Sequence, residues 1–308
     1  MSGAWVSAQE AQAALGIKGS ALRGRFARGS IKRNADGRYW IDTAPAPPPP
    51  TPRPRPVEVP QDAQRSAFRL RPIVGIFDVH VPDHDTRLWA SFLAWCRDER
   101  PREVIIGGDF LEMESCSEHG GVARPAMFTE DIAAGRVALR QLRENNPDAV
   151  ITYLEGNHET RLRRKVVNGI PELTGALTLP EELGLRELGI AWHPYGKIVR
   201  RGKLGFVHGW WCNDHHAAKH LRETGTSIAY GHTHRPQFYT RGDIDGSVKG
   251  AFGMPCMRSL SAEWLDGKPS GWMQGFGVFY LHGDEGHFSP YMVLAVDGKF
   301  VWNGRVYS

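Results

Sequence analysis

Short runs of apolar residues recur through most of the chain after residue 70, and glycine and polar residues follow each of them. Five of these runs have the length and near-continuous apolar character of buried strands. They occupy residues 73–77, 104–106, 149–154, 204–207 and 227–230. Apolar positions at helical spacing fall between the first three runs, over 86–99 and 129–145. This alternation predicts an α/β domain, and the aromatic- and glycine-rich sequence after Ala251 predicts further hairpins of the same domain.

The first 43 residues have a different pattern. Ser7 is a suitable N-cap for a helix over 8–15, and a second helix is predicted over 21–28; a glycine follows each. An Asp-Gly turn signal separates two short runs, 30–33 and 38–41. Helix, turn, helix and hairpin is the plan of a winged helix-turn-helix, so we predict a small head domain of this type.

A proline-rich stretch separates the two patterned regions. Nine of the 17 residues from Ala44 to Pro60 are proline, which excludes a helix or a central strand because proline fixes φ and lacks an amide donor. We interpret the stretch as an extended spacer; a proline-rich ligand for an aromatic groove is the alternative. The predicted domains are a head (1–43), a linker (44–62) and a large domain (63–308).

The net charge of +4 comes from the head and the linker. Residues 1–60 hold nine of the 38 basic and four of the 34 acidic residues, which leaves 29 basic and 30 acidic residues for the rest. A basic head on a near-neutral body indicates that the head contacts a polyanion.

Composition argues against several other classes of protein. No apolar run approaches the roughly 18 residues of a membrane span, so we expect no membrane partner. The N-terminus lacks the basic and apolar regions of a secretory signal, and the four cysteines form no C-x-x-C pair. We therefore expect a cytoplasmic protein with reduced thiols.

Residue types that bind metals follow each of the five strand-like runs. Open α/β sheets place their sites at the carboxyl ends of the strands. The sequences found there are Asp78-Val79-His80, Gly107-Gly108-Asp109, Gly156-Asn157-His158-Glu159, His208-Gly209 and Gly231-His232-Thr233-His234. Oxygen and imidazole ligands without a thiolate suit Mn²⁺, Fe or Zn²⁺, so the sequence predicts a metal site.

In this order, D-x-H, G-D, G-N-H-E, H-G and G-H-x-H resemble the five motifs of the calcineurin-like metallophosphoesterases, over residues 72–285. The resemblance implies a four-layer α/β sandwich, in which helices flank two mixed β-sheets, and two divalent metal ions. Mn²⁺ is the favoured ion, with Fe, Zn²⁺ and Ni²⁺ as alternatives. The implied ligands are Asp78, His80 and His234 for the first ion, Asn157, His208 and His232 for the second, and Asp109 between the two.

The resemblance also implies a mechanism, in which a hydroxide that bridges the ions attacks phosphorus in line. His158 resembles the general acid of the family, which protonates the leaving oxygen. Arg161 is a candidate to bind a substrate oxygen and so assist catalysis; a solvated arginine in a charged run is the alternative. His84, shortly after the first motif, is a candidate to line the substrate pocket.

Two departures of this sequence from the motifs of known subfamilies narrow the choice of subfamily. Ser/Thr phosphatases of this family carry G-D-x-x-D-R-G, whose arginine contacts phosphate, whereas here Gly108-Asp109 is followed by Phe-Leu-Glu-Met-Glu. Repair exonucleases usually have G-N-H-D, where Glu159 stands here. D-V-H-V-P together with G-N-H-E-x-R is similar to phosphoesterases often carried by bacteriophages, for which the compartment would be the host cytoplasm.

The head, in turn, resembles the DNA-binding heads of MerR and excisionase-like proteins. Its second helix would present four basic side chains to DNA: Lys18, Arg23, Arg25 and Arg28. Small basic helical heads also dock proteins or only solubilise a chain, and this alternative stays open.

One hypothesis about function leads and two alternatives remain. The leading hypothesis is hydrolysis of phosphodiesters in nucleic acid, as a nuclease or phosphodiesterase, with the tethered head raising the local concentration of DNA. The first alternative is a phosphomonoesterase that acts on nucleotides or phosphoproteins. The second is a non-catalytic DNA-binding regulator, against which the complete set of ligands and His158 argues. The sequence leaves the oligomeric state open.

Overall fold

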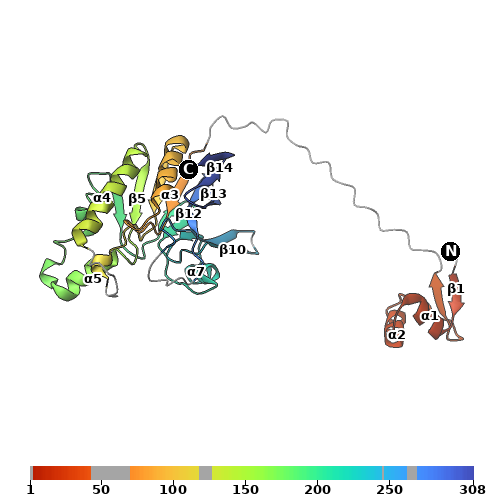
Figure 1. Cartoon of the computed structure of the whole chain (residues 1–308). Helices are drawn as coiled ribbons and strands as arrows, with labels where there is room; N and C mark the ends of the chain where they lie inside the picture. The colour runs from red at the N-terminus through yellow and green to blue at the C-terminus, as the bar shows by residue number, and fades with distance from the viewer. Residues whose placement is uncertain (1–2, 43–69, 118–126, 245, 262–268) are drawn as a thin grey trace. The chain divides into compact units, whose positions relative to one another are not determined.

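The computed structural model describes residues 3–42, 70–117, 127–244, 246–261 and 269–308 (Figure 1). The chain divides into two compact units, residues 1–65 and 66–308. The proline-rich linker lies outside the described residues.

The head consists of two short helices beside a pair of antiparallel strands. The elements are β1 (Gly3–Val6), α1 (Ala8–Leu15), α2 (Gly19–Ala27) and β2 (Tyr39–Asp42). Ser7 caps α1 in a capping box with Glu10, and Gly16 ends it in the left-handed conformation. The core is small because only Ala11, Leu22 and Tyr39 are buried hydrophobics of the described head.

The strand pairing of the head differs from the predicted hairpin. β2 pairs along its length with β1, which the sequence pattern did not predict. The two runs of the predicted hairpin are connected by one isolated β-bridge, between Arg33 and Tyr39. In the turn between them, Asn34 Oδ1 accepts a hydrogen bond from the Arg38 amide. The register of β1 sets Trp5 opposite Trp40, with ring centroids 5.3 Å apart. Four paired residues and a cross-strand aromatic contact hold β2 on β1.

A six-stranded mixed sheet forms the centre of the large domain. In spatial order its strands are β13 (His287–Ala295), β12 (Gln274–His282), β3 (Ile73–Ile76), β4 (Glu103–Ile106), β5 (Val150–Leu154) and β6 (Ile190–His193). The four strands from β3 to β6 are parallel, and β12 is antiparallel to β3. The helices α3 (Thr86–Glu99) and α4 (Phe128–Glu144) connect β3 to β4 and β4 to β5.

A second mixed sheet has five strands. In spatial order they are β10 (Gln237–Gly242), β11 (Val248–Gly253), β9 (Ile228–Tyr230), β8 (Leu204–Val207) and β7 (Val199–Arg201). β8 and β9 are parallel, and α7 (His216–Thr224) connects them. The remaining elements are η1 (Glu114–Cys116), α5 (Thr160–Gly169), η2 (Pro171–Leu173), α6 (Leu179–Glu182) and the hairpin of β14 (Phe300–Trp302) and β15 (Arg305–Tyr307).

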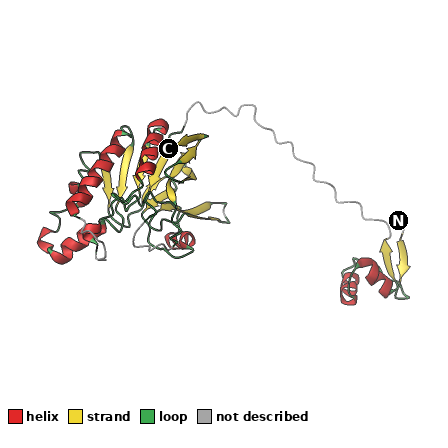
Figure 2. Ribbon diagram, viewed as in Figure 1, coloured by secondary structure: helices red, strands yellow, loops and turns green. Residues whose placement is uncertain are grey.

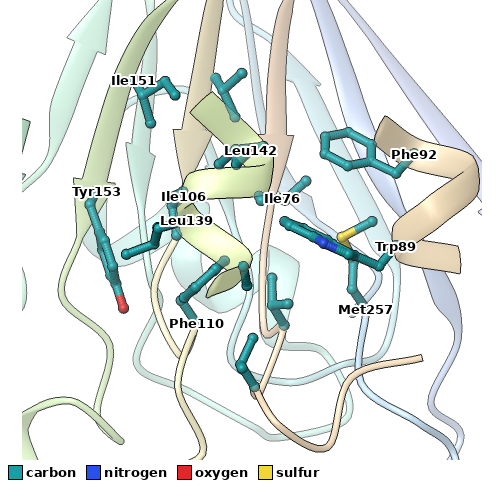
Figure 3. Packing of buried hydrophobic residues seen from close by; sticks show 14 of the residues in the cluster. Ile76, Trp89, Phe92, Ile106, Phe110, Leu139, Leu142, Ile151, Tyr153 and Met257 are labelled. Carbon is teal, nitrogen blue, oxygen red and sulfur yellow. The ribbon is translucent and has the colours of Figure 1, made fainter. Parts of the chain in front are cut away.

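The alternation of side chains along the strands produces four layers (Figure 2). On one face of the six-stranded sheet, Ile76 and Ile106 pack with Phe92 of α3 and Leu139 of α4 (Figure 3). Residues of the other face pack with the five-stranded sheet, as Ile105 does in one cluster with Phe206. Buried side chains of α7 cover the outer face of the five-stranded sheet. The prediction of two mixed sheets flanked by helices is confirmed.

No helix among the described residues has the length and apolar character needed to cross a membrane.

Candidate metal centre

The carboxyl ends of five strands bring the polar motifs together. Three of these strands, β3, β4 and β5, are parallel neighbours in one sheet, and β8 and β9 are parallel neighbours in the other. Because the side chains after them share the same end of the sandwich, residues far apart in sequence come into contact. The structure places all seven predicted ligands here: Asp78, His80, Asp109, Asn157, His208, His232 and His234.

A first group of ligand atoms comes from the loops after β3 and β9. Asp78, His80 and His234 each offer one atom, and these atoms lie within 4.8 Å of one another. His80 Nε2 is 3.0 Å from His234 Nε2, and His234 Nε2 is 3.4 Å from Asp78 Oδ1. The two imidazole nitrogens and the carboxylate therefore converge on a common point, as the ligands of one ion do.

A second group comes from the loops after β4, β5, β8 and β9. Asp109, His208 and His232 offer atoms within 4.8 Å of one another. Asn157 Oδ1 joins them at 2.9 Å from His208 Nε2, which is 3.3 Å from Asp109 Oδ2. Asp109 also belongs to a further group with His80 and His158. Its carboxylate thus lies between the two groups, where a bridging ligand belongs.

The backbone around the site is strained at the ligands themselves. Positive φ is uncommon in residues other than glycine and clusters at functional sites. Five ligands have it: Asp78 at 51°, His80 at 58°, Asp109 at 48°, His232 at 69° and His234 at 56°.

Two glycines allow the close approach of the chain to the carboxylates. A Cβ on Gly156 would collide with Asp109 Oδ1, and a Cβ on Gly231 would collide with Asp78 Oδ2. The glycines of the G-N-H-E and G-H-x-H motifs are therefore required by space, because any side chain would occupy the position of a carboxylate oxygen.

Charges in the cluster shift one another's pKa values. Burial opposes the charged form of Asp109, yet the His208 and His158 imidazoles hold its pKa well below the usual value. Against the same opposition from burial, Asp109 raises the pKa of His208 to about 9, and Asp78 raises that of His234 to about 10. Burial lowers the pKa of His80 to about 4. The site is thus a compact set of anionic oxygens and imidazoles that stabilise each other.

Hydrogen bonds to the far ring nitrogens aim two histidines at the centre. His208 Nδ1 lies 3.0 Å from the Gly107 carbonyl, and His80 Nδ1 lies 2.7 Å from Glu112 Oε2. Each Nδ1–H is donated to oxygen, which leaves Nε2 free to bind a cation.

Two buried glutamates organise the site, although the sequence motifs assigned them no role. Glu159 accepts hydrogen bonds from four donors: Asp109 N, Leu111 N, Gly156 N and Tyr153 Oη. It therefore joins the loops after β4 and β5. Burial first, and the Asp109 carboxylate second, raise the pKa of Glu159 to about 7. Glu112 contacts His80, and the spacing Gly108-Asp109-x-x-Glu112 was the signal available in the sequence.

His158 lies beside the ligands with one ring nitrogen toward them. Its Nδ1 is 2.7 Å from the Glu112 carbonyl, and its Nε2 is 3.8 Å from Asp109 Oδ2. Arg161, in the first turn of α5, donates to the Glu112 carbonyl at 2.8 Å and to His158 Nε2 at 3.0 Å. The structure therefore places Arg161 against His158 at the edge of the cluster.

The remaining site candidates are not among the ligand groups of the described residues. The His84 ring packs edge-on against Trp89 at 6.0 Å, and its Nδ1 is 3.2 Å from the Pro82 carbonyl. It belongs to none of the ligand groups found among the described residues. In the head, four basic side chains are exposed on and beside α2: Lys18, Arg23, Arg25 and Arg28.

The residues fit a pair of divalent ions on two observations. The ligand atoms belong to carboxylate, amide and imidazole groups, which suit borderline divalent ions. An aspartate is shared between the two groups, as a pair of neighbouring cations requires. The glycine positions next to Asp109 and Asp78 leave those carboxylates the space beside the backbone that any side chain would fill. The clusters are thus suited to hold divalent metal.

Glu159→Gln is expected to destabilise the metal-free protein by about 2 kcal/mol, because either orientation of the amide sets its NH₂ against at least one buried backbone N–H. Urea unfolding in the presence of a chelator measures this. Glu144→Gln, at an exposed helical position, is the control and should leave the free energy of unfolding within about 0.5 kcal/mol. Equal stability of the two variants would contradict the role assigned to Glu159.

No protein-family model matches the chain, and no curated protein matches it. Solved structures similar to it include vacuolar protein sorting 29 from Cryptosporidium parvum, at 14% identity, a TM-score of 0.40 and coverage of 78% of this chain and 95% of that one. Vps29 from Chaetomium thermophilum has 12% identity, a TM-score of 0.37 and coverage of 72% and 96%. Nuclease MPE from Pseudomonas putida has 15% identity, a TM-score of 0.32 and coverage of 71% and 86%. With TM-scores below 0.5, these likenesses support no statement about the function of this chain.

Proposed function

We propose that this chain is a binuclear metal-dependent phosphoesterase that hydrolyses phosphodiesters, with nucleic acid as its substrate. One observation carries the proposal. Five strand ends from two sheets converge on two groups of metal ligands that Asp109 connects, and His158 lies at their edge. A purely structural metal site would need neither the shared carboxylate nor a further histidine beside it.

The proposed ions are two divalent cations, with Mn²⁺ favoured. When bound, they would supply Lewis acidity that lowers the pKa of water and polarises a phosphoryl oxygen. Asp78, His80 and His234 would hold one ion, Asn157, His208 and His232 the other, and Asp109 both. Strained backbone and buried hydrogen bonds hold these side chains in place before substrate arrives, as preorganised sites require.

His158 is the proposed general acid. Its Nδ1–H is donated to the Glu112 carbonyl, so its Nε2 is the nitrogen that carries and releases a proton toward a leaving oxygen. Arg161 contacts that same Nε2. Protonation of Nε2 would turn the guanidinium away, and it would then be free to bind a phosphoryl oxygen of the substrate.

Hydrolysis of three substrates by the Mn²⁺-loaded protein tests the proposal: bis-p-nitrophenyl phosphate, p-nitrophenyl phosphate and DNA. We expect the diester and DNA to be cleaved with higher kcat/KM than the monoester. Preference for the monoester with intact DNA would favour a phosphomonoesterase. Bound Mn²⁺ without turnover of any of the three would favour a non-catalytic regulator.

The head is proposed to bind DNA while the large domain carries the chemistry. The head has a hydrophobic cluster of its own, and its four basic side chains Lys18, Arg23, Arg25 and Arg28 are exposed. A chain that begins near Gln61 is expected to bind metal and cleave small phosphodiesters at the full-length rate, with a sharp loss of affinity for DNA. Fluorescence anisotropy of a labelled duplex across a salt series measures that affinity.

The salt dependence provides the sharper comparison. If about four basic residues of the head meet phosphates, log affinity of the full-length protein should fall against log salt with a slope of about −3.6. Equal affinity and equal slope for the shortened chain would show that the head is not a DNA-binding module.

A further inference from the structure

Arg258 is a buried cation next to the proposed active site, and no motif of the sequence pointed to it. It follows β11 and is 5% exposed. Its guanidinium contacts Glu112 Oε2 through Nη1 and Asp83 Oδ2 through Nη2 at 3.0 Å. A buried guanidinium requires such partners, because an unpaired charge in the interior is strongly destabilising.

The partner of Arg258, Glu112, is the residue on which both halves of the proposed chemistry depend. Its side chain accepts the hydrogen bond from His80 Nδ1 at 2.7 Å. Its backbone carbonyl accepts hydrogen bonds from His158 Nδ1 and from Arg161. A ligand of the first ion and the proposed general acid are therefore oriented by one glutamate.

Glu112 lies in a crowded acidic environment. Oxygens of Asp83, Glu112 and Glu114 lie within 4.8 Å of one another. Burial raises the pKa of Glu114, and the Glu112 and Asp83 carboxylates raise it further. Without a cation between them, these carboxylates would repel each other, and this repulsion would favour a different rotamer of Glu112.

We infer that Arg258 is a positioning residue of the proposed phosphoesterase site, which holds Glu112 between the guanidinium and His80 and thereby keeps His80 Nε2 directed at the first ion. The inference rests on the proposed function. Arg258 acts through Glu112, because the partners of its guanidinium among the described residues are Glu112 and Asp83 rather than a proposed metal ligand or His158.

The geometry also explains why arginine is required at this position. Two separate nitrogens of one planar group meet two carboxylates at once, Nη1 on Glu112 and Nη2 on Asp83. A lysine ammonium is a single point of charge on a flexible stem and cannot reproduce this fork. In the phosphatases that carry an arginine in the second motif, that arginine lies within the motif itself. Here the arginine that contacts Glu112 lies 146 residues after Glu112 in the chain.

Arg258→Met tests the inference, because it keeps much of the volume and removes the charge. Mn²⁺ binding to the full-length protein, followed by electron paramagnetic resonance, should show two ions in the wild type. We expect one of them to bind about 10–100-fold more weakly in Arg258→Met, the usual effect of losing an outer partner of a ligand. The other ion should keep its affinity. Arg258→Lys should retain part of the affinity but not all of it.

Arg201→Met is the matched control. Arg201 makes a two-point ion pair with the buried Glu103, at 2.7 and 2.6 Å, and Glu103 begins β4, at the end opposite to the ligand loops. Its loss should lower thermal stability and leave both Mn²⁺ affinities unchanged. This control separates the general cost of breaking an Arg–Glu pair from an effect on the first ion.

A second measurement does not depend on metal or activity. Long-range ¹H–¹⁵N correlation spectra of the metal-free protein report the histidine tautomers, and His80 should carry its proton on Nδ1 in the wild type. Arg258→Met should shift this resonance toward a mixture of tautomers, whereas Arg201→Met should not. If Arg258→Met does not fold, Arg258→Lys, which keeps the charge but not the two-point contact, should still shift the His80 resonance in the same direction by a smaller amount.

The outcomes that oppose the inference differ from those that oppose the proposed function. Unchanged Mn²⁺ affinities and an unchanged His80 resonance in Arg258→Met, with thermal stability lowered as in Arg201→Met, would reduce Arg258 to a structural ion pair. Two ions in the wild type would meanwhile leave the proposed function standing. A wild-type protein that binds no divalent ion would instead remove the proposed function itself.

Discussion

Replacing Asp109 with asparagine is expected to lower phosphodiester turnover by several orders of magnitude and to reduce the metal bound per chain. Asp109 shares a ligand group with His80, a proposed ligand of the first ion, and another with His208 and His232, proposed ligands of the second, so it should contact both ions. Two cations about 3.5–4 Å apart repel strongly unless an anionic ligand lies between them. Asparagine keeps the shape and an oxygen but removes the charge that offsets this repulsion.

The fold should survive the substitution. Asp109 Oδ1 accepts a hydrogen bond from the His158 amide at 2.8 Å, and the asparagine carbonyl can accept the same bond. Elemental analysis measures the bound metal, and hydrolysis of bis-p-nitrophenyl phosphate measures turnover. Asp131→Asn is the matched control, because Asp131 is buried and bonded to Ser115 but belongs to none of the ligand groups in the described chain.

Retention of two metals and near-normal turnover by Asp109→Asn would show that the assignment of the bridging ligand is wrong. Equal metal loss in Asp131→Asn would show instead that any buried carboxylate of this region affects the site through folding.

Replacing His158 with alanine should reduce hydrolysis of a nucleotide ester by about 10²–10⁴-fold and leave the metal content unchanged. The ring faces the cluster through Nε2, which is 3.8 Å from Asp109 Oδ2 and accepts a hydrogen bond from Arg161 rather than pointing freely at the ligands. A general acid matters less when the leaving group is already stable as an anion. The loss should therefore be much smaller for a p-nitrophenyl ester than for the nucleotide ester.

The comparison between the two esters is the measurement that separates the roles. Single-turnover rates on both substrates, with metal content determined on the same samples, give the ratio directly. His287→Ala, on the distant strand β13, should change neither rate. Equal losses on both esters in His158→Ala would remove the general-acid role, and a loss of metal would make His158 a ligand.

The large domain was predictable because its signals are local. A run such as 104–106 is apolar on both faces and ends at glycine and aspartate, and these features follow from a few neighbouring residues. The same holds for the cap of α1, where Ser7 and Glu10 are three residues apart. Because parallel strands end on one edge, polar residues at their ends also predicted which side chains meet.

The head shows where local signals are insufficient. The Asp36-Gly37 turn signal was correctly placed in a turn, but the partner of Tyr39–Asp42 is Gly3–Val6. Four residues are too few for an alternation pattern to identify a strand, and the choice of partner depends on packing of Trp5 with Trp40.

The outer layer of the site shows the same limit over a longer range. Arg258 and Glu112 are 146 residues apart and meet inside the domain. Arg258 is one of 38 basic residues, and nothing in the residues around it indicates that its side chain is buried. Glu159 likewise belongs to a sequence motif, but its role depends on four hydrogen-bond donors that come together only in the folded domain.

By itself the sequence determined the five strands that precede the polar motifs, and the identity and order of the residues offered at their ends, because each depends on the chemistry of adjacent residues. Tertiary structure alone decided the partner of β2, the place of Arg161 against His158, and the chain of contacts from Arg258 through Glu112 to His80. Those are contacts between distant segments, and their formation depends on how two sheets pack, on which charges become buried together and on which ring nitrogen each hydrogen bond occupies.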